Sequence, residues 1–141
     1  MVKPSLRVLH INDIYELEFL PRFATCVKEY VARGREEGCQ TVVMLPGDFV
    51  APSLLSSLDH AYGMVDCLNR CGLQYVCLGN HETDIPHREL LRRIEESKFK
   101  WINTNMPEFN AGHLGKLPTH DVFTVNDAWG VARRVGVLGL L

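Results

Sequence analysis

The sequence has 141 residues, 46% hydrophobic and 23% charged, which is the composition of one ordinary globular domain. A net charge of −2 gives no electrostatic basis for nucleic-acid binding, and no apolar run approaches the roughly 20 residues that cross a membrane. The five cysteines are odd in number and lack the spacing of a secreted framework, and the N-terminus has no apolar signal region. We therefore expect a cytoplasmic protein with neither nucleic acid nor membrane as a partner.

Apolar runs and helical patterns alternate over the first two-thirds of the chain. Strands are expected at residues 6–11, 41–45, 75–78 and 99–102. An amphipathic helix beginning near Pro21 and broken by Gly34 or Gly38 follows the first strand. Shorter helical patterns lie around residues 54–58 and 64–68, and another begins at Pro86. This alternation predicts a parallel sheet with right-handed crossovers.

The pattern changes after Met106. A loop rich in glycine and proline is expected to run to about Pro118. Two strand-like runs follow, at residues 121–125 and 131–141, and residues 126–130 between them are typical of a hairpin turn. The expected fold is therefore α/β, with a parallel βαβαβαβ sheet followed by a β-hairpin.

Polar side chains follow each of the four expected strands. Because the carboxyl ends of parallel strands meet at one edge, these side chains are expected to lie together. Their oxygen atoms suit a hard or borderline divalent ion, and two such ions a few ångströms apart would clamp a phosphate. The side chains are Asp13 after the first strand, Asp48 after the second, Asn80 and His81 after the third, and Asn103 and Asn105 after the fourth.

The segment after the third strand carries the densest group of candidates. Gly79 allows a sharp turn or a close approach, and Asn80 offers a carbonyl oxygen to a metal. His81 can transfer a proton near neutral pH or bind a metal. Asp84 has two possible roles: it can orient His81 by accepting a ring N–H, or it can cap the helix that begins at Pro86.

Residues 79–84, Gly-Asn-His-Glu-Thr-Asp, resemble the Gly-Asn-His-Glu motif of the calcineurin-like metallophosphoesterases, and their 5′-nucleotidase branch in particular. Thr83 stands where that branch usually has Phe. Residues 9–13, 47–48, 101–105 and 135–140 resemble further motifs of the same branch. The resemblance implies the N-terminal half of an αββα sandwich, with residues 1–141 as the N-terminal portion of the domain and its C-terminal metal-ligand half absent.

The resemblance also implies roles for individual residues and a cofactor. Asp13 would bind a first metal, Asp48 would bridge two metals, and Asn80 would bind the second. His81 would act at the leaving oxygen, with Asp84 as its partner. The cofactor would be two divalent ions drawn from Mn, Zn, Fe, Co or Mg. Asn103 and Asn105 correspond to a strand end that we assign to substrate binding.

The chain departs from the family pattern in two places. Tyr15 stands where the opening motif has a His ligand of the first metal, so Tyr15 would be a different ligand and would alter that position. The histidines that complete the family's site, ending in Gly-His-x-His, have no counterpart before Leu141. We expect weak metal affinity and little turnover from these 141 residues alone, and association with the missing half of the domain.

Two functions fit these observations. The first is a metal-dependent phosphoester hydrolase, a 5′-nucleotidase-like phosphomonoesterase that acts on nucleotides through a dinuclear metal site. The alternative is a catalytically impaired domain that retains the fold and binds metal or a partner. Tyr15 and the absent histidines favour the alternative, whereas the agreement of the remaining motifs favours the hydrolase.

Overall fold

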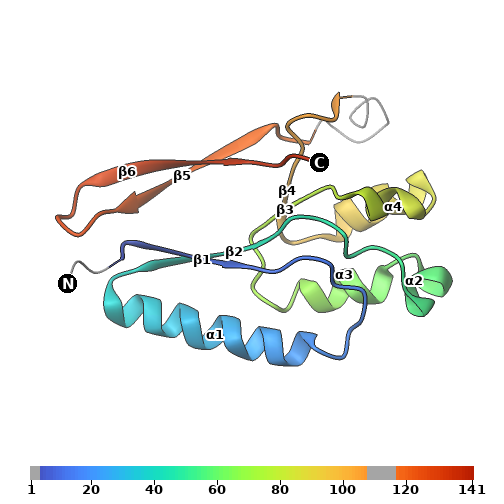
Figure 1. Cartoon of the computed structure of the whole chain (residues 1–141), viewed down its shortest axis with the longest axis horizontal. Coiled ribbons are helices and arrows are strands. Elements are labelled where there is room, and N and C mark those ends of the chain that lie inside the picture. The colour runs from blue at the N-terminus through green and yellow to red at the C-terminus, as the bar shows by residue number, and fades with distance from the viewer. Residues whose placement is uncertain (1–3, 108–116) are drawn as a thin grey trace.

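The computed structural model describes residues 4–107 and 117–141, so most of the loop expected after Met106 lies outside the described residues. No helix in these two ranges is long and apolar enough to cross a membrane. The chain begins β1 (Leu6–His10), α1 (Leu20–Glu37), β2 (Gln40–Leu45), α2 (Leu54–Asp59), α3 (Tyr62–Leu68) and β3 (Tyr75–Cys77). It continues with a short 3₁₀-helix η1 (Asn80–Asp84), α4 (His87–Glu96), β4 (Lys100–Ile102), β5 (His120–Asn126) and β6 (Ala132–Leu138) (Figure 1).

The first four strands form one parallel sheet in the order β1-β2-β3-β4. Val8 pairs with Val42 in this register, and Val76 pairs with Trp101. All four strands therefore end at the same edge, where α2, η1 and α4 lie in Figure 1. Strands β5 and β6 form a separate antiparallel pair. The predicted α/β fold, with its parallel sheet and following hairpin, is confirmed.

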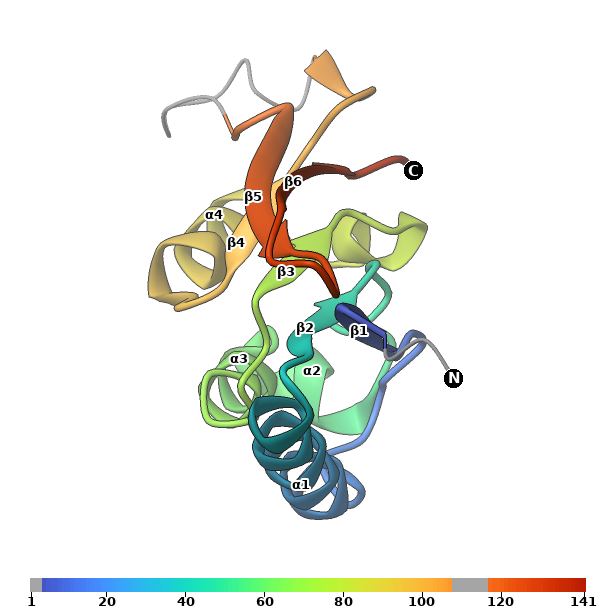
Figure 2. The same cartoon turned by 90° about the vertical axis from the view of Figure 1, so that its left-hand side faces the viewer.

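Helices α1 and α3 lie along one face of the sheet, and the apolar core fills the space between them (Figures 1 and 2). Phe49, which follows β2, is 1% exposed and packs against the rings of Phe99 and Trp101, with centroid distances between 5.3 and 6.2 Å. Burial of a side chain of this size stabilises a protein by about 1.5–3 kcal/mol. This packing fixes the chain one residue beyond Asp48.

The hairpin lies across the opposite face of the sheet (Figures 1 and 2). The Tyr75 hydroxyl donates a hydrogen bond of 2.8 Å to the Asp121 carboxylate, and the Tyr75 ring stacks on Phe123 at 6.1 Å. Lys100 also pairs with Asp121. The contacts from Lys100 and Tyr75 lower the pKa of Asp121. The hairpin is therefore tied to β3 and β4 by polar and aromatic contacts.

The end of the first helix resolves the choice between two glycines. Helix α1 continues through Gly34 and ends at Glu37, and Gly38 follows as its C-cap with φ of +70°. A side chain at Gly34 would lie 2.6 Å from the Cys39 carbonyl oxygen and 2.6 Å from the Thr41 hydroxyl. Gly34 therefore permits close packing of α1 on the start of β2, whereas Gly38 provides the left-handed turn that ends the helix.

Candidate active site

The loops after β1 and β2 meet at the carboxyl edge of the sheet. Asp13 and Asp48 both have left-handed backbones, with φ of 55° and 56°, and such conformations in residues other than glycine cluster at functional sites. The Ile14 N–H donates to the Asp48 carbonyl oxygen at 3.0 Å, which joins the two loops. The two aspartates therefore lie at one edge of the sheet, as their positions in the sequence predict.

The loops after β2 and β3 approach each other through two glycines. A side chain on Gly79 would lie 2.3 Å from Asp48 Oδ1, and one on Gly47 would lie 2.3 Å from the Gly79 nitrogen. Gly79 has φ of −109°, an angle that other residues adopt. Glycine is therefore needed at this position for the close approach of the two loops and not for the backbone angle. The His81 N–H donates to Asp48 Oδ1 at 2.9 Å, which joins η1 to the β2 loop.

Glu82 braces both of these loops from inside the protein. Its side chain is completely buried, and its carboxylate accepts a hydrogen bond of 2.5 Å from the Gly79 N–H. It also accepts from the N–H groups of Asp48, Phe49 and Val50, at 2.9, 3.0 and 3.3 Å. Hydrogen bonds to a buried charged acceptor are among the strongest in proteins. Sequence patterns alone assigned no role to Glu82.

His81 and Asp84 form the predicted pair. His81 Nδ1 lies 2.6 Å from Asp84 Oδ2, and this contact raises the pKa of His81. The helix after them has Pro86 at its N-cap with no side-chain capping bond, so the alternative role of Asp84 as a cap is not seen. Because Asp84 engages Nδ1, Nε2 is the ring nitrogen that this contact leaves available.

Tyr15 connects Asp13 with His81. Its hydroxyl donates to Asp13 Oδ1 at 2.8 Å, and this hydrogen bond raises the pKa of Tyr15 to about 12. The side-chain amide of Asn12 contacts the other oxygen, Asp13 Oδ2. The Tyr15 ring meets the His81 ring edge-on, with centroids 5.9 Å apart and an interplanar angle of 87°. The structure thus brings Asp13, Tyr15, His81 and Asp84 into one connected group.

The three candidate asparagines have different surroundings. Asn80 is exposed, and its side chain makes no hydrogen bond with residues 4–107 or 117–141. The Asn103 side chain is buried and bonds to the backbone N–H and carbonyl of Met106, at 3.1 and 2.8 Å. The Asn105 side chain bonds in the same way to the backbone of Leu141, at 3.1 and 3.0 Å. Asn103 therefore holds the backbone of its own turn, Asn105 holds the distant backbone of Leu141, and their substrate roles stay predictions.

Asp48 and Asn80 fit a divalent ion better than Asp13 does. No group of three or more His, Cys, Asp or Glu side chains within the described residues is placed to hold a metal. Asp48 and Asn80 offer the carboxylate and amide oxygens that hard divalent ions prefer. Both oxygens of Asp13, in contrast, already face neutral hydrogen-bond donors, Tyr15 and Asn12.

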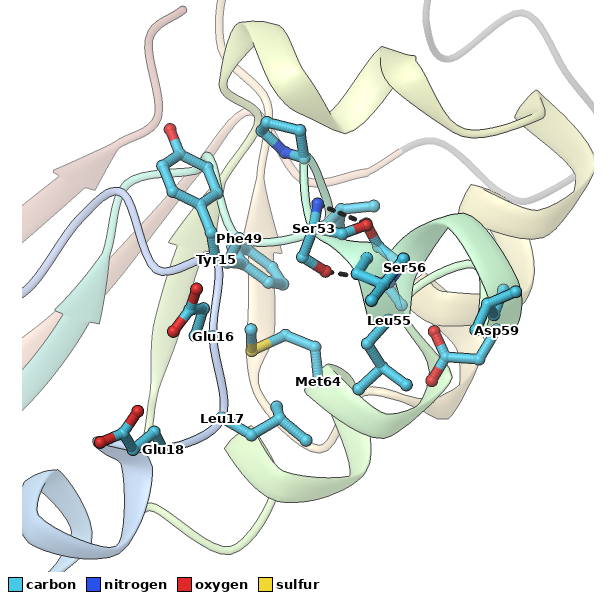
Figure 3. Close-up of a pocket in the computed structure, with 15 residues that line it drawn as sticks. Tyr15, Glu16, Leu17, Glu18, Phe49, Ser53, Leu55, Ser56, Asp59 and Met64 are labelled. Carbon is cyan, nitrogen blue, oxygen red and sulfur yellow. Dashed lines mark hydrogen bonds between the residues drawn. The ribbon is translucent and has the colours of Figure 1, made fainter.

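A cavity of about 500 Å³ opens beside Tyr15, between residues 15–18 and the helices α2 and α3 (Figure 3). Phe49, Leu55 and Met64 supply apolar surface to its wall, and Glu16 adds a carboxylate. Sequence patterns alone gave no sign of this cavity, because it is formed by segments that are distant in the chain. Its position next to Tyr15 places apolar surface beside the group of polar side chains.

The fold and the polar strand ends agree with what sequence comparison finds. The pattern that defines the calcineurin-like phosphoesterases matches residues 6–135, so the chain belongs to this family. The family membership supports phosphoester hydrolysis as the class of reaction.

Known relatives of this chain include 5′-nucleotidases. The NAD 5′-nucleotidase of Haemophilus influenzae is 27% identical over 100 residues, which are 70% of this chain and 16% of that protein. The solved structure of the H. influenzae NAD nucleotidase matches 96% of this chain and 26% of its own, with 21% identity and a TM-score of 0.73. The 5′-nucleotidase precursor from Thermus thermophilus matches 96% of this chain and 28% of its own, with 19% identity and a TM-score of 0.70.

Proposed function

We propose that this chain is the N-terminal portion of a metal-dependent phosphomonoesterase that acts on nucleotides. The observation that carries the proposal is the position of His81. Asp84 contacts its imidazole ring, and the backbone N–H of His81 donates a hydrogen bond to Asp48. A proton donor is thereby held beside oxygen atoms suited to a divalent ion. The relatives named as 5′-nucleotidases support nucleotides as the substrate class.

In this proposal, each group at the edge has one task. Asp48 and Asn80 would hold a divalent ion, which would supply positive charge to the phosphoryl oxygens. His81, with Nδ1 engaged by Asp84, directs Nε2 to the leaving oxygen and donates a proton to it. The raised pKa of His81 favours the protonated imidazole that this role needs. The cavity beside Tyr15 offers apolar surface to the group that leaves.

The remaining ligands of the proposed metal site come from outside these 141 residues. The chain spans 16% of the length of the curated relative and 26% and 28% of the two solved structures. We propose that the rest of the domain supplies the missing ligands. The family resemblance implies two divalent ions, and the contacts of Asp13 with Tyr15 bear on how many of them this chain helps to hold. We also retain a cytoplasmic location, for which the five free cysteines are the support.

The second candidate is a domain that keeps the fold and binds metal or a partner without efficient hydrolysis. The hydrogen bond from Tyr15 to Asp13 favours it, because this bond occupies a carboxylate oxygen that the hydrolase would use.

The two candidates are separated by a hydrolysis assay on the full-length protein with a nucleoside 5′-monophosphate and added Mn²⁺. The hydrolase predicts metal-dependent release of phosphate that falls about 100- to 10,000-fold in His81→Ala. His87→Ala, at an exposed position in α4, is the matched control and should hydrolyse at the wild-type rate. Metal binding without phosphate release, or full activity in His81→Ala, would contradict the hydrolase.

A further inference from the structure

Both carboxylate oxygens of Asp13 contact hydrogen-bond donors from its own loop, so neither is free of a partner as a vacant metal ligand would be. Oδ1 accepts a hydrogen bond of 2.8 Å from the Tyr15 hydroxyl, and Oδ2 is in contact with the Asn12 side-chain amide. Both donors lie within two residues of Asp13, so the loop satisfies this carboxylate without any group from the rest of the protein.

The identity of residue 15 decides what that position can offer. An imidazole can present a nitrogen lone pair that carries no proton, which suits a metal. A phenol hydroxyl presents a proton, and here Tyr15 directs that proton at the neighbouring carboxylate. With an imidazole at residue 15, that residue and Asp13 could bind the same metal ion. With Tyr15, the two side chains form a hydrogen bond with each other instead.

The oxygens on the β2 and β3 side are less occupied. Asp48 Oδ1 accepts from the His81 N–H, and among the described residues no hydrogen bond to Asp48 Oδ2 is present. The exposed Asn80 side chain makes no hydrogen bond in the described part of the chain. Glu82 and the Gly47–Gly79 contact fix the backbone of this loop pair from beneath, and neither the Asn80 amide nor Asp48 Oδ2 is taken by another described side chain.

We propose that this chain contributes to one divalent-ion position, that of Asp48 and Asn80, and that Tyr15 closes the other, because it gives Asp13 a hydrogen bond and supplies no metal ligand. The inference concerns the same site as the proposed function and rests on it for the location of the ion. It differs from the two ions that the family resemblance implies. A site with one ion presents less positive charge to a phosphoryl group than a site with two.

The test counts ions on the purified full-length protein after equilibration with Mn²⁺, by elemental analysis and by electron paramagnetic resonance. The wild type should hold one ion per chain with the spectrum of an isolated Mn²⁺. Tyr15→His introduces an imidazole beside Asp13 and should raise the count to two, with the spectrum of a coupled pair. Tyr15→Phe is the matched control: it removes the hydroxyl without adding a metal ligand, and its count should stay at one.

Each other result overturns the inference. A wild-type count of two, or of none, contradicts it directly and does not depend on any variant folding. A count of one in a folded Tyr15→His protein shows that Tyr15 is not the residue that closes the position. The ion count is separate from turnover: one ion without phosphate release supports this inference and contradicts the proposed hydrolase, whereas two ions with phosphate release do the reverse.

Discussion

The loops after β1 and β2 carry the two aspartates of the candidate site, yet they are held in different ways. The β2 loop presents three consecutive backbone N–H groups, starting at Asp48, to the buried carboxylate of Glu82. In the β1 loop, Asp13 is exposed and is held by two nearby side chains, Asn12 and Tyr15. One half of the site is thus fixed from the protein interior, whereas the other half depends on side chains that a single substitution can change.

The largest expected effect comes from the interior support. Glu82→Ala leaves four backbone N–H groups without their acceptor, and the free energy of unfolding should fall by at least about 3 kcal/mol in a urea titration. Glu95→Ala, at an exposed glutamate of α4, is the matched control and should change the free energy of unfolding by less than about 0.5 kcal/mol. Equal effects of the two substitutions would show that Glu82 does not brace the β2 loop.

The next effect concerns the close approach of the β2 and β3 loops. Gly79→Ala would place a methyl group 2.3 Å from Asp48 Oδ1, so one loop must shift, at an expected cost of about 1–3 kcal/mol in the free energy of unfolding. Gly136→Ala in β6 is the control, because a side chain there meets no atom within 4 Å. Its unfolding midpoint should stay at or above that of the wild type. A Gly79→Ala protein as stable as Gly136→Ala would mean that the loops can separate freely.

A smaller effect is expected on the β1 side. Tyr15→Phe removes one hydrogen bond to an exposed carboxylate, so the free energy of unfolding should fall by no more than about 1 kcal/mol. The measurement is the same urea titration that is used for Glu82→Ala. A loss as large as that of Glu82→Ala would remove the contrast between the two loops.

The smallest effect lies at the rim, where His81 contacts Asp84. Asp84→Asn should lower the pKa of His81 in the metal-free protein, as read from an NMR titration of the imidazole. Because the contact raises the pKa of His81 in the folded state, its stabilising effect is present below the unfolded pKa and is lost as the pH rises through the folded pKa. The difference in thermal midpoint between wild type and Asp84→Asn should therefore shrink as the pH rises above about 6.5, the ordinary pKa of histidine. An unchanged His81 titration would show that Asp84 does not orient the ring.

The main sheet could be predicted because each of its strands is recognisable from a short stretch of sequence. Val42 and Val43 are neighbours in β2 and are both 1% exposed, so the run shows no alternation between polar and apolar residues. Such runs, separated by helical patterns, predict a parallel sheet, and a parallel sheet brings its strand ends to one edge. The contact between His81 and Asp84 was also predictable, because it spans only three residues.

The support beneath the site could not be predicted in the same way. Glu82 and the Asp48 N–H that it accepts are 34 residues apart, and only the folded sheet brings them together. The hydrogen bonds of Asn103 are easier to anticipate from sequence. Asparagine side chains commonly bond to nearby backbone in turns, as Asn103 does with Met106. A substrate role was expected for Asn103 because it lies at a strand end and because residues 101–105 resemble a motif of the 5′-nucleotidases.

The contact of Glu82 with the β2 loop limits how the two segments can be exchanged for others. Residues 47–50 take their shape from a carboxylate and a glycine that lie more than thirty positions further along the chain. A relative could not exchange one segment for a different loop and keep the other without leaving N–H groups buried and unbonded. The two segments therefore depend on each other, and a protein engineer grafting this site onto another α/β sheet would have to transplant both together.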